Sequence, residues 1–121
     1  KNYRKKIILI DRFTDSTIAY QHFGMNINIK IIKLLNKFIT GNFTSDITFL
    51  STVNVKNLKY RLKNRLNLNR YDKFKLNFYN KVQNGYYKIS KNKKNYIIID
   101  SNKKNISDVK KIIINKLKKI I

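Results

Sequence analysis

The sequence predicts an α/β protein with a parallel sheet, for which we expect three strands and four to five helices. Three short apolar runs have the length and composition of buried strands, and they occupy residues 6–10, 47–53 and 96–100. Segments with apolar residues at helical spacing separate these runs, and this alternation is typical of parallel α/β folds. Three strands are few for such a sheet. We therefore expect the sheet to be incomplete and the chain to be a fragment.

A polar segment follows the first strand, which ends at Asp11. Residues 14–16 are Thr, Asp and Ser, which favour the start of a helix. A helix that begins there brings together on one face residues spaced by three, four and seven positions. These residues are Thr17, Tyr20, Gln21 and Gly24. The face carries a hydroxyl, a phenol and an amide beside a position without a side chain.

Four further segments have the apolar periodicity of helices that bury one face. Residues 26–40 carry a stripe of Ile27, Ile31, Leu34, Leu35 and Phe38. A short helix capped by Asn54 turns Val55, Leu58 and Leu62 inward. A longer helix from Asp72 turns inward Phe74, Phe78, Val82, Tyr86 and Ile89. The last helix has an inner stripe of Ile106, Val109, Ile113, Leu117 and Ile120. We expect this last, basic helix to cover one face of the sheet; the alternative is a membrane-surface role.

The formal charge of +22 has two explanations. Strongly basic chains often bind polyanions, but the abundant Lys, Asn, Ile, Tyr and Phe can all be encoded by A/T-rich codons. Glutamate is absent, which base composition does not explain. There is no cysteine, which excludes disulfides and thiolate sites. No apolar run has transmembrane length and no signal peptide is recognisable, so we expect a soluble, cytoplasmic protein without a membrane partner.

Arginine is informative because only five of the 28 basic residues are Arg. A planar guanidinium suits bidentate contact with phosphate better than an ammonium group does. Arg12 and the set Arg61, Arg65 and Arg70 are therefore candidate phosphate ligands. Asp11, at the carboxyl end of a strand, could hold Mg²⁺ directly or through water. A single His and six scattered Asp form no zinc-like cluster or nucleophile motif, so phosphate chemistry is the coherent interpretation.

Several motifs, in one order, resemble the thymidylate kinase family. The runs IDRF and DSTIAYQ, followed by Gly24, are similar to the family's acceptor-binding pattern. The similarity continues through LLNKFITGNFTSDITFL, NRYDKF, KVQNGYYKI and YIIIDSNKKNISDV, and covers essentially all 121 residues. It implies a P-loop NTPase-like, three-layer αβα fold. Residues 1–121 would be the C-terminal part of one nucleoside monophosphate kinase domain, with an acceptor-binding segment at 11–24 and a lid at about 61–72.

The resemblance implies phosphorylation of dTMP to dTDP with ATP and Mg²⁺, a step of dTTP synthesis. Arg12 would bind the dTMP phosphate, and Asp11 would serve the magnesium and the phosphoryl transfer. Thr17 and Gln21 would lie by thymine and Tyr20 by the deoxyribose. Tyr86 matches a tyrosine near the monophosphate, although its spacing also fits the core. The remaining family positions, in the lid and near ATP, are Arg61, Arg65, Arg70 and Asn102. Asn102 matches a region near adenine, but its place in the loop after the third strand favours a plain loop residue.

The sequence also departs from the family pattern. No G-x-x-x-x-G-K-[ST] motif occurs in it, so the backbone cradle for the ATP phosphates is missing. In the family that loop follows a central strand, between the strands that match 6–10 and 47–53. Thr52, Ser45, Met25 and Gln83 replace common Asp, Pro, Arg and Arg residues. We therefore expect this chain to be unstable and inactive alone. The resemblance also implies a homodimer when the protein is complete.

Two alternatives stay open. The chain could serve a kinase for another nucleoside or nucleotide, although the face with Thr17, Tyr20 and Gln21 favours thymidine. It could instead be a basic nucleic-acid-binding protein whose aromatic residues stack on bases. Three of those aromatics, at positions 74, 78 and 86, have the spacing of core residues, which argues against a nucleic-acid partner.

Overall fold

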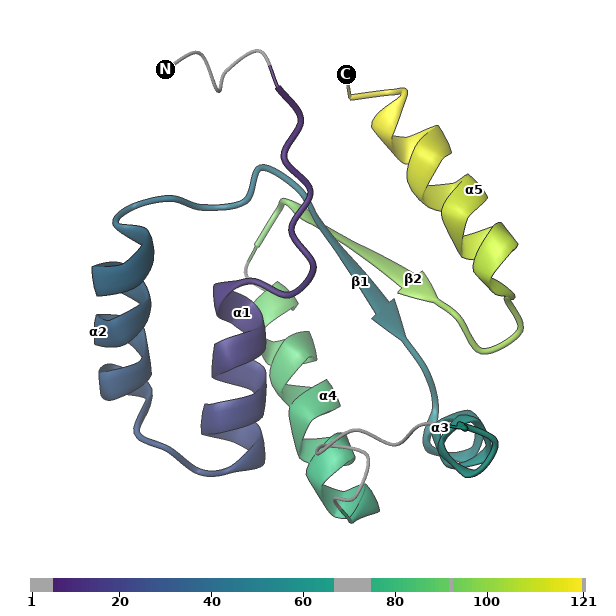
Figure 1. Cartoon of the computed structure of the whole chain (residues 1–121), viewed down its shortest axis with the longest axis horizontal. Helices are drawn as coiled ribbons and strands as arrows, with labels where there is room; N and C mark the ends of the chain where they lie inside the picture. The colour runs from purple at the N-terminus through teal and green to yellow at the C-terminus, as the bar shows by residue number, and fades with distance from the viewer. Residues whose placement is uncertain (1–5, 67–74, 92, 121) are drawn as a thin grey trace.

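The computed structural model describes residues 6–66, 75–91 and 93–120. These residues form five α-helices, one π-helical segment and a parallel sheet of two strands. In chain order the elements are α1 (Thr14–Thr17), η2 (Ile18–Gly24), α2 (Ile29–Thr40), β1 (Thr48–Thr52), α3 (Val55–Lys63), α4 (Leu76–Lys91), β2 (Tyr96–Asp100) and α5 (Ile106–Leu117). Figure 1 shows α1 and α4 side by side, with α5 running antiparallel to β2.

The sheet confirms the α/β class and two of the predicted strands. β1 and β2 pair in parallel, in a register that runs from Thr48 opposite Tyr96 to Thr52 opposite Asp100. α3 and α4 form the connection between them, as a parallel pair requires. The carboxyl ends of both strands therefore meet at one edge, where β1 leads into α3 and β2 leads toward α5 (Figure 1).

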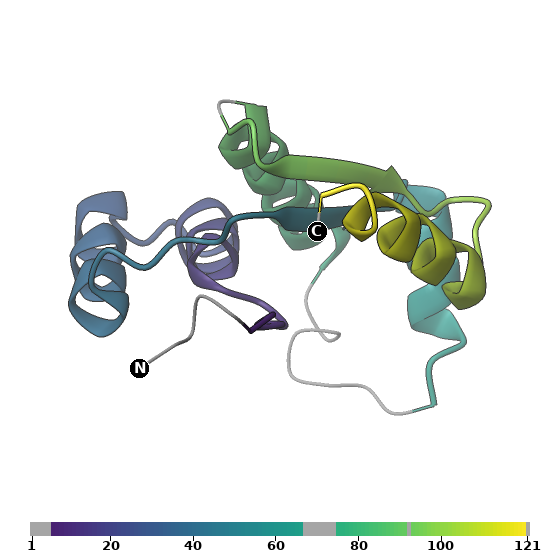
Figure 2. The ribbon, with the colours of Figure 1, turned by 90° about the horizontal axis from the view of Figure 1, so that it is seen from above.

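The third predicted strand is wrong. Residues 7–10 have no regular secondary structure, and their side chains are between 48% and 84% exposed. A strand requires a neighbour for its backbone hydrogen bonds, and among the described residues β1 and β2 pair only with each other. Seen from above, residues 6–10 lie to one side of the sheet rather than within it (Figure 2). The apolar run has the composition of a strand, but among the described residues it has no neighbouring strand to pair with.

A core cluster lies between η2 and α4, and Leu50 of β1 and Ile99 of β2 are buried as well. The buried residues of the cluster are Ala19, Phe78, Tyr79 and Val82. Leu58 and Leu62 of α3 pack against this cluster, as their spacing predicts, and so do Tyr86 and Ile89 of α4. Residues 72–74, where the sequence predicts the start of α4, lie outside the described residues.

The acceptor-binding segment departs from the predicted helix in its winding. After one turn of α-helix, residues Ile18–Gly24 continue as a π-helix, whose hydrogen bonds span five residues. The predicted grouping of four side chains on one face assumed 3.6 residues per turn. In the structure, Gly24 instead faces Phe78 of α4, and Ala19 between the predicted positions is fully buried. The helix also begins at Thr14 without a side-chain cap.

Helix α2 has the predicted apolar stripe, but it faces the solvent. Asn28 caps the helix by accepting a hydrogen bond from the Lys30 N–H. Ile32, on the opposite side, is 3% exposed, whereas Phe38 in the stripe is 87% exposed. The predicted periodicity is correct and the predicted burial is wrong, because α2 contacts η2 through its other face.

Helix α5 is bounded by a capping box formed by Asn105 and Asp108. Val109, Ile113 and Leu117 are half-buried, as the predicted stripe requires. Ile106 and Ile120, at the ends of the stripe, are exposed, so the prediction holds only for the middle of the helix. Within the described parts of the chain, no helix has both the length and the apolar character needed to cross a membrane.

Candidate functional site

Arg12 is placed by an unusual backbone conformation directly before α1. Its φ angle is 63°, in the left-handed region that residues other than Asn, Asp and Gly rarely adopt. The guanidinium carbon lies 5.0 Å from the centre of the Tyr20 ring, and Nη2 donates to the Tyr20 hydroxyl at 3.4 Å. Arg12 is nevertheless exposed. Its charge is therefore held in place on an aromatic face while still open to an anion.

Tyr20, which the Arg12 guanidinium contacts, packs against Tyr86. Their rings meet edge to face with centres 6.5 Å apart, and Tyr20 also meets the Phe78 ring at 5.9 Å. The Tyr86 hydroxyl lies 2.5 Å from the Ser16 Oγ, which joins α4 to α1. Burial raises the pKa of Tyr86, and the Ser16 hydrogen bond partly offsets that rise. Tyr86 is thus a neutral phenol at physiological pH, serving both the core and the site.

Gln21 carries an unmet hydrogen-bonding group. Among the described residues, its Oε1 is the buried side-chain oxygen or nitrogen atom without a partner. A buried acceptor left unsatisfied costs about 1–3 kcal/mol, and such atoms in folded proteins need an explanation. Thr17, one turn earlier in the helix, is half-buried. The orphan atom makes this segment a candidate for binding a ligand with a hydrogen-bond donor.

Asp11 is exposed beside Arg12. The part of the chain that the structure describes contains no group of three or more His, Cys, Asp or Glu placed to hold a metal ion. Mg²⁺ is commonly held by one or two carboxylates together with water and substrate phosphates. A single carboxylate at this position fits that kind of site.

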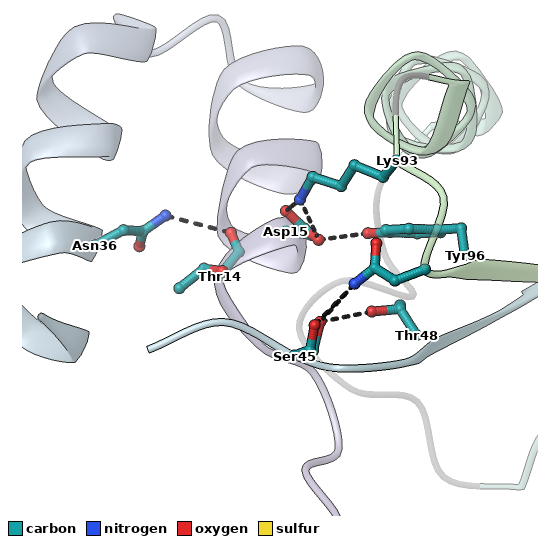
Figure 3. A network of polar contacts seen from close by, with 8 residues as sticks. Thr14, Asp15, Asn36, Ser45, Thr48, Lys93 and Tyr96 are labelled. Atoms are coloured by element: carbon teal, nitrogen blue, oxygen red, sulfur yellow. Dashed lines mark hydrogen bonds and ion pairs between the residues drawn. The ribbon is translucent and has the colours of Figure 1, made fainter. Parts of the chain in front are cut away.

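A polar network anchors the start of α1 to the amino end of β2 (Figure 3). Lys93 Nζ lies 2.8 and 2.9 Å from the two carboxylate oxygens of Asp15, and the Tyr96 hydroxyl donates to the same group. Beside it, Asn95 donates to the Ser45 carbonyl at 2.8 Å. Asp15 therefore acts as an anchor to the sheet, whereas its position in the sequence predicts a helix cap.

This network predicts an alkaline limit to stability. Burial, the hydrogen bond to Asp15 and its negative charge raise the pKa of Tyr96 above its usual value near 10. The resulting stabilisation is fully present below pH 10 and is lost as the pH rises through the folded-state pKa. We expect Tyr96→Phe to lower the free energy of unfolding by about 1 kcal/mol at pH 7. Urea unfolding between pH 8 and 11, on the chain folded with the amino-terminal half of its domain, should show a smaller loss of unfolding free energy at high pH for the variant than for the parent sequence.

The candidate lid residues fall into a different region. Arg61, near the end of α3, donates to the Ser101 carbonyl at 2.6 Å. Asn102 lies in the same loop after β2 and accepts from the Asn54 N–H at 2.8 Å. Arg65 is exposed just beyond α3, and Arg70 lies outside the described residues. The structure thus gathers Arg12, Tyr20 and Tyr86 in one cluster and Arg61 and Asn102 in another.

Several contributors to these clusters carry no signal in the sequence. Ser16 and Ser101 are short polar residues whose partners lie 70 and 40 positions away. Gln83, noted only as a departure, accepts a hydrogen bond from the Val53 N–H after β1 at 3.3 Å. These partners come together only through the packing of α4 against η2 and the hydrogen bonds between α3 and the loop after β2.

Comparison with known proteins gives a consistent result. The family model described as thymidylate kinase matches residues 1–113. A thymidylate kinase of Trichodesmium erythraeum is 38% identical over 99 residues, covering 82% of this chain and 44% of that protein. A thymidylate kinase of Thermosipho africanus is 40% identical over 96 residues, covering 79% and 47%.

A solved structure agrees with the sequence matches. The crystal structure of a thymidylate kinase from Ehrlichia chaffeensis superposes with a TM-score of 0.61 at 27% identity, covering 96% of this chain and 52% of that one. The chain therefore spans about half the length of the relatives that it matches. Its helices and parallel strands correspond to part of a P-loop NTPase-like fold. On the extent of these matches, the chain belongs to the thymidylate kinase family.

Proposed function

We propose that this chain provides the acceptor-binding part of an enzyme that phosphorylates dTMP to dTDP with ATP and Mg²⁺. The observations that carry the proposal are the exposed guanidinium of Arg12, held over Tyr20, and the unpaired Oε1 of Gln21, the next residue along the same segment. A fixed positive charge and an orphan acceptor suit a ligand with a phosphate at one end and a hydrogen-bond donor at the other. A nucleoside monophosphate has both.

The base and sugar would be read by the π-helical segment and its neighbour in α1. Thymine has one ring N–H donor, and Gln21 Oε1 is an acceptor in need of one. Thr17 would lie at the same edge of the base. Tyr20 would lie against the deoxyribose, where a phenol leaves no room for a 2′-hydroxyl. This arrangement favours dTMP over ribonucleotides.

The phosphate would be held by Arg12 through a bidentate contact, for which a guanidinium is suited. Asp11 would bind Mg²⁺ directly or through water. The ion would neutralise charge on the phosphoryl group during transfer. Arg65 and Arg70 would approach the same group from the lid at about 61–72. Tyr86 would lie near the monophosphate, with its hydroxyl oriented by Ser16.

The donor side of the reaction requires sequence beyond these 121 residues. The relatives are about twice as long, and their additional part would supply the phosphate-binding loop for ATP. It would also supply the strand that residues 7–10 and the free edge of β1 lack. An unpaired sheet edge with exposed apolar neighbours favours aggregation. We therefore expect the chain alone to be unstable and unable to transfer phosphate.

Reconstitution tests this function directly. The chain is refolded with the amino-terminal half of the Trichodesmium relative, and ADP release is followed with dTMP, dUMP, UMP or AMP as acceptor. We expect no transfer by either half alone, and transfer preferring dTMP in the mixture. A stoichiometric complex that transfers phosphate equally to AMP, or to none of the four, would contradict the proposal. The former result would favour another nucleotide kinase.

The exposed stripe of α2 is the proposed homodimer surface. Leu34 and Phe38 are its most exposed members on one face, and residues of this type are rarely left uncovered together. We expect the double variant Leu34→Lys, Phe38→Lys to convert a dimeric reconstituted enzyme into monomers, measured by analytical ultracentrifugation. Lys30→Ala, on the exposed side of the same helix, is the control and should leave the dimer intact.

Two aromatic side chains at core spacing do not support a nucleic-acid-binding alternative. Phe78 is buried in the core between η2 and α4, and Tyr86 is half-buried against the same cluster. Stacking platforms for bases must present their ring faces to solvent.

A cytoplasmic location and the absence of a membrane partner stay predictions that accompany the proposed enzyme.

A further inference from the structure

Helix α3 is tied to the loop after β2 by a set of polar contacts that no step of the proposed reaction explains. We call this set the α3 clamp. Its members are Asn54, Asn57, Arg61, Asp100, Ser101 and Asn102. The contacts between its two halves join residues 40 or more positions apart in sequence, at the edge where the carboxyl ends of both strands meet (Figure 1).

Asn102 is the centre of the clamp because its side chain uses both ends. Its Oδ1 accepts from the Asn54 N–H at 2.8 Å and from Asn57 Nδ2 at 3.1 Å. Its Nδ2 and its backbone N–H donate to one oxygen of Asp100, at 2.6 and 2.9 Å. The amide thus connects the first turn of α3 to the last residue of β2.

Arg61 makes the second connection one to two turns further along α3. Its Nη2 donates to the Ser101 carbonyl at 2.6 Å, and its Nη1 reaches the Ser101 hydroxyl at 3.3 Å. Ser101 is only 4% exposed, and its hydroxyl and N–H both donate to the Thr52 carbonyl at the end of β1. The Arg61 guanidinium therefore binds Ser101, a residue that is itself hydrogen-bonded to the end of β1.

Apolar packing alone holds α3 weakly. None of its residues is buried, and only Leu58 and Leu62 reach the core cluster. Two contacts on one stripe allow a helix to rotate about that stripe. The clamp attaches the helix at its start and near its end, so it opposes this rotation.

We propose that Asn102 and Arg61 are positioning residues that lock α3 to the carboxyl end of the sheet. The lock fixes where α3 ends, and Arg65 follows two residues after that end. In the proposed function, which this consequence rests on, the base of the lid and the loop after β2 then move as one body. The locking itself depends only on the contacts described above.

A distance measurement tests the lock without any nucleotide. The measurement uses the reconstituted protein, with an amino-terminal half that carries no cysteine. This chain has none, so Lys59→Cys on α3 and Lys81→Cys on α4 provide two unique, exposed sites for spin labels. Pulsed electron paramagnetic resonance gives the distribution of distances between them. We expect Asn102→Ala to broaden this distribution roughly twofold or more, because local contacts set the stability of local openings. Asn115→Ala, on an exposed position of α5, is the control and should change nothing.

A rescue variant separates the lock from a general loss of structure. Exchanging the two side chains, as Asp100→Asn with Asn102→Asp, keeps the net charge, keeps an acceptor at position 102 for Asn54 and Asn57, and places a donor amide at position 100 opposite the new carboxylate; only the backbone N–H of residue 102 loses its bond at that atom. We expect the exchange to restore the narrow distribution that Asn102→Ala loses. An unchanged distribution in both Asn102→Ala and Arg61→Lys would overturn the proposal. So would broadening that accompanies an equal loss of near-ultraviolet circular dichroism across all variants, the exchange included.

A kinetic measurement on the reconstituted enzyme gives the functional consequence. Asn102→Ala should raise the KM for ATP several-fold and leave the KM for dTMP unchanged, because the clamp lies away from the Arg12 cluster. Absence of activity in the parent enzyme would contradict the proposed function and leave the spin-label result standing. Equal changes in both KM values would contradict the expectation that the clamp affects ATP binding and not dTMP binding.

Discussion

Arg12→Ala is expected to lower the affinity for dTMP by roughly 100-fold or more. Hydrogen bonds to charged groups contribute about 1.5–3 kcal/mol each, and a guanidinium can make two parallel bonds to one phosphate. The Tyr20 ring holds this group in position before the ligand arrives, so little freedom is lost on binding. Isothermal titration calorimetry at physiological salt measures the loss, and Lys37→Ala on exposed α2 is the matched control for removing one positive charge.

Two further substitutions at the same position separate charge, geometry and strain. Arg12→Lys keeps the charge but cannot make the bidentate contact, and we expect a loss of affinity of about tenfold. Arg12→Gly relieves the left-handed backbone at φ 63° but loses the contact with Tyr20. Its free energy of unfolding should stay within about 1 kcal/mol of the parent, while dTMP binding is lost. Equal affinity in Arg12→Ala and the parent would mean that the phosphate binds elsewhere.

Gly85→Ala is expected to destabilise the protein by roughly 1–3 kcal/mol through overpacking. A Cβ at this position would lie 2.6 to 2.8 Å from three atoms of Phe23, among them its Cβ. Those atoms lie close to the backbone of η2, so the ring cannot move aside without shifting the helix. Alanine favours a helix interior over glycine by about 1 kcal/mol, which the steric conflict must exceed. Urea unfolding of the reconstituted protein measures the difference.

The neighbouring residue supplies the control for this prediction. Asn84→Ala changes an exposed position of the same helix and should alter stability by no more than about 0.5 kcal/mol. Phe23→Leu should recover part of the loss when combined with Gly85→Ala, because the two positions are in contact. A stabilised Gly85→Ala variant would show that η2 and α4 pack less closely than the structure indicates.

The elements predicted well from sequence are those fixed by local interactions. Asn54 was predicted to cap α3, and its side chain accepts from the Asn57 N–H. Strands β1 and β2 lie within the predicted runs, because continuous β-branched segments between turn residues have few other stable conformations. Phe78 and Val82 of α4 are buried as their periodicity requires.

The elements predicted poorly depend on partners that the local sequence does not specify. Residues 6–10 have strand composition, but a strand forms only beside another strand. The stripe of α2 shows that one face is apolar without showing what covers it. The π-helical winding of Ile18–Gly24 arises where two glycines allow η2 and α4 to approach closely, a contact between positions about 60 apart.

The candidate site shows the same division. The site roles of Arg12, Tyr20 and Gln21 stay predictions from the motif in which they lie; the structure gives Arg12 and Tyr20 a shared contact. Ser16, which orients Tyr86, and Ser101, which holds Arg61, were not predicted. Their roles follow from single hydrogen bonds between distant segments, and any serine in the chain has the same local sequence signal.

The most direct test of the acceptor-site proposal is to map dTMP binding by NMR on the isotopically labelled, reconstituted protein. We predict that dTMP shifts the amide signals of residues 12–21 and of Tyr86, that thymidine produces weaker changes in the same residues, and that AMP leaves them unaffected. Shifts that spread over the lysine-rich surface, equal for dTMP and AMP and lost at high salt, would contradict a specific site. In that case, the chain would bind nucleotides only through its net charge.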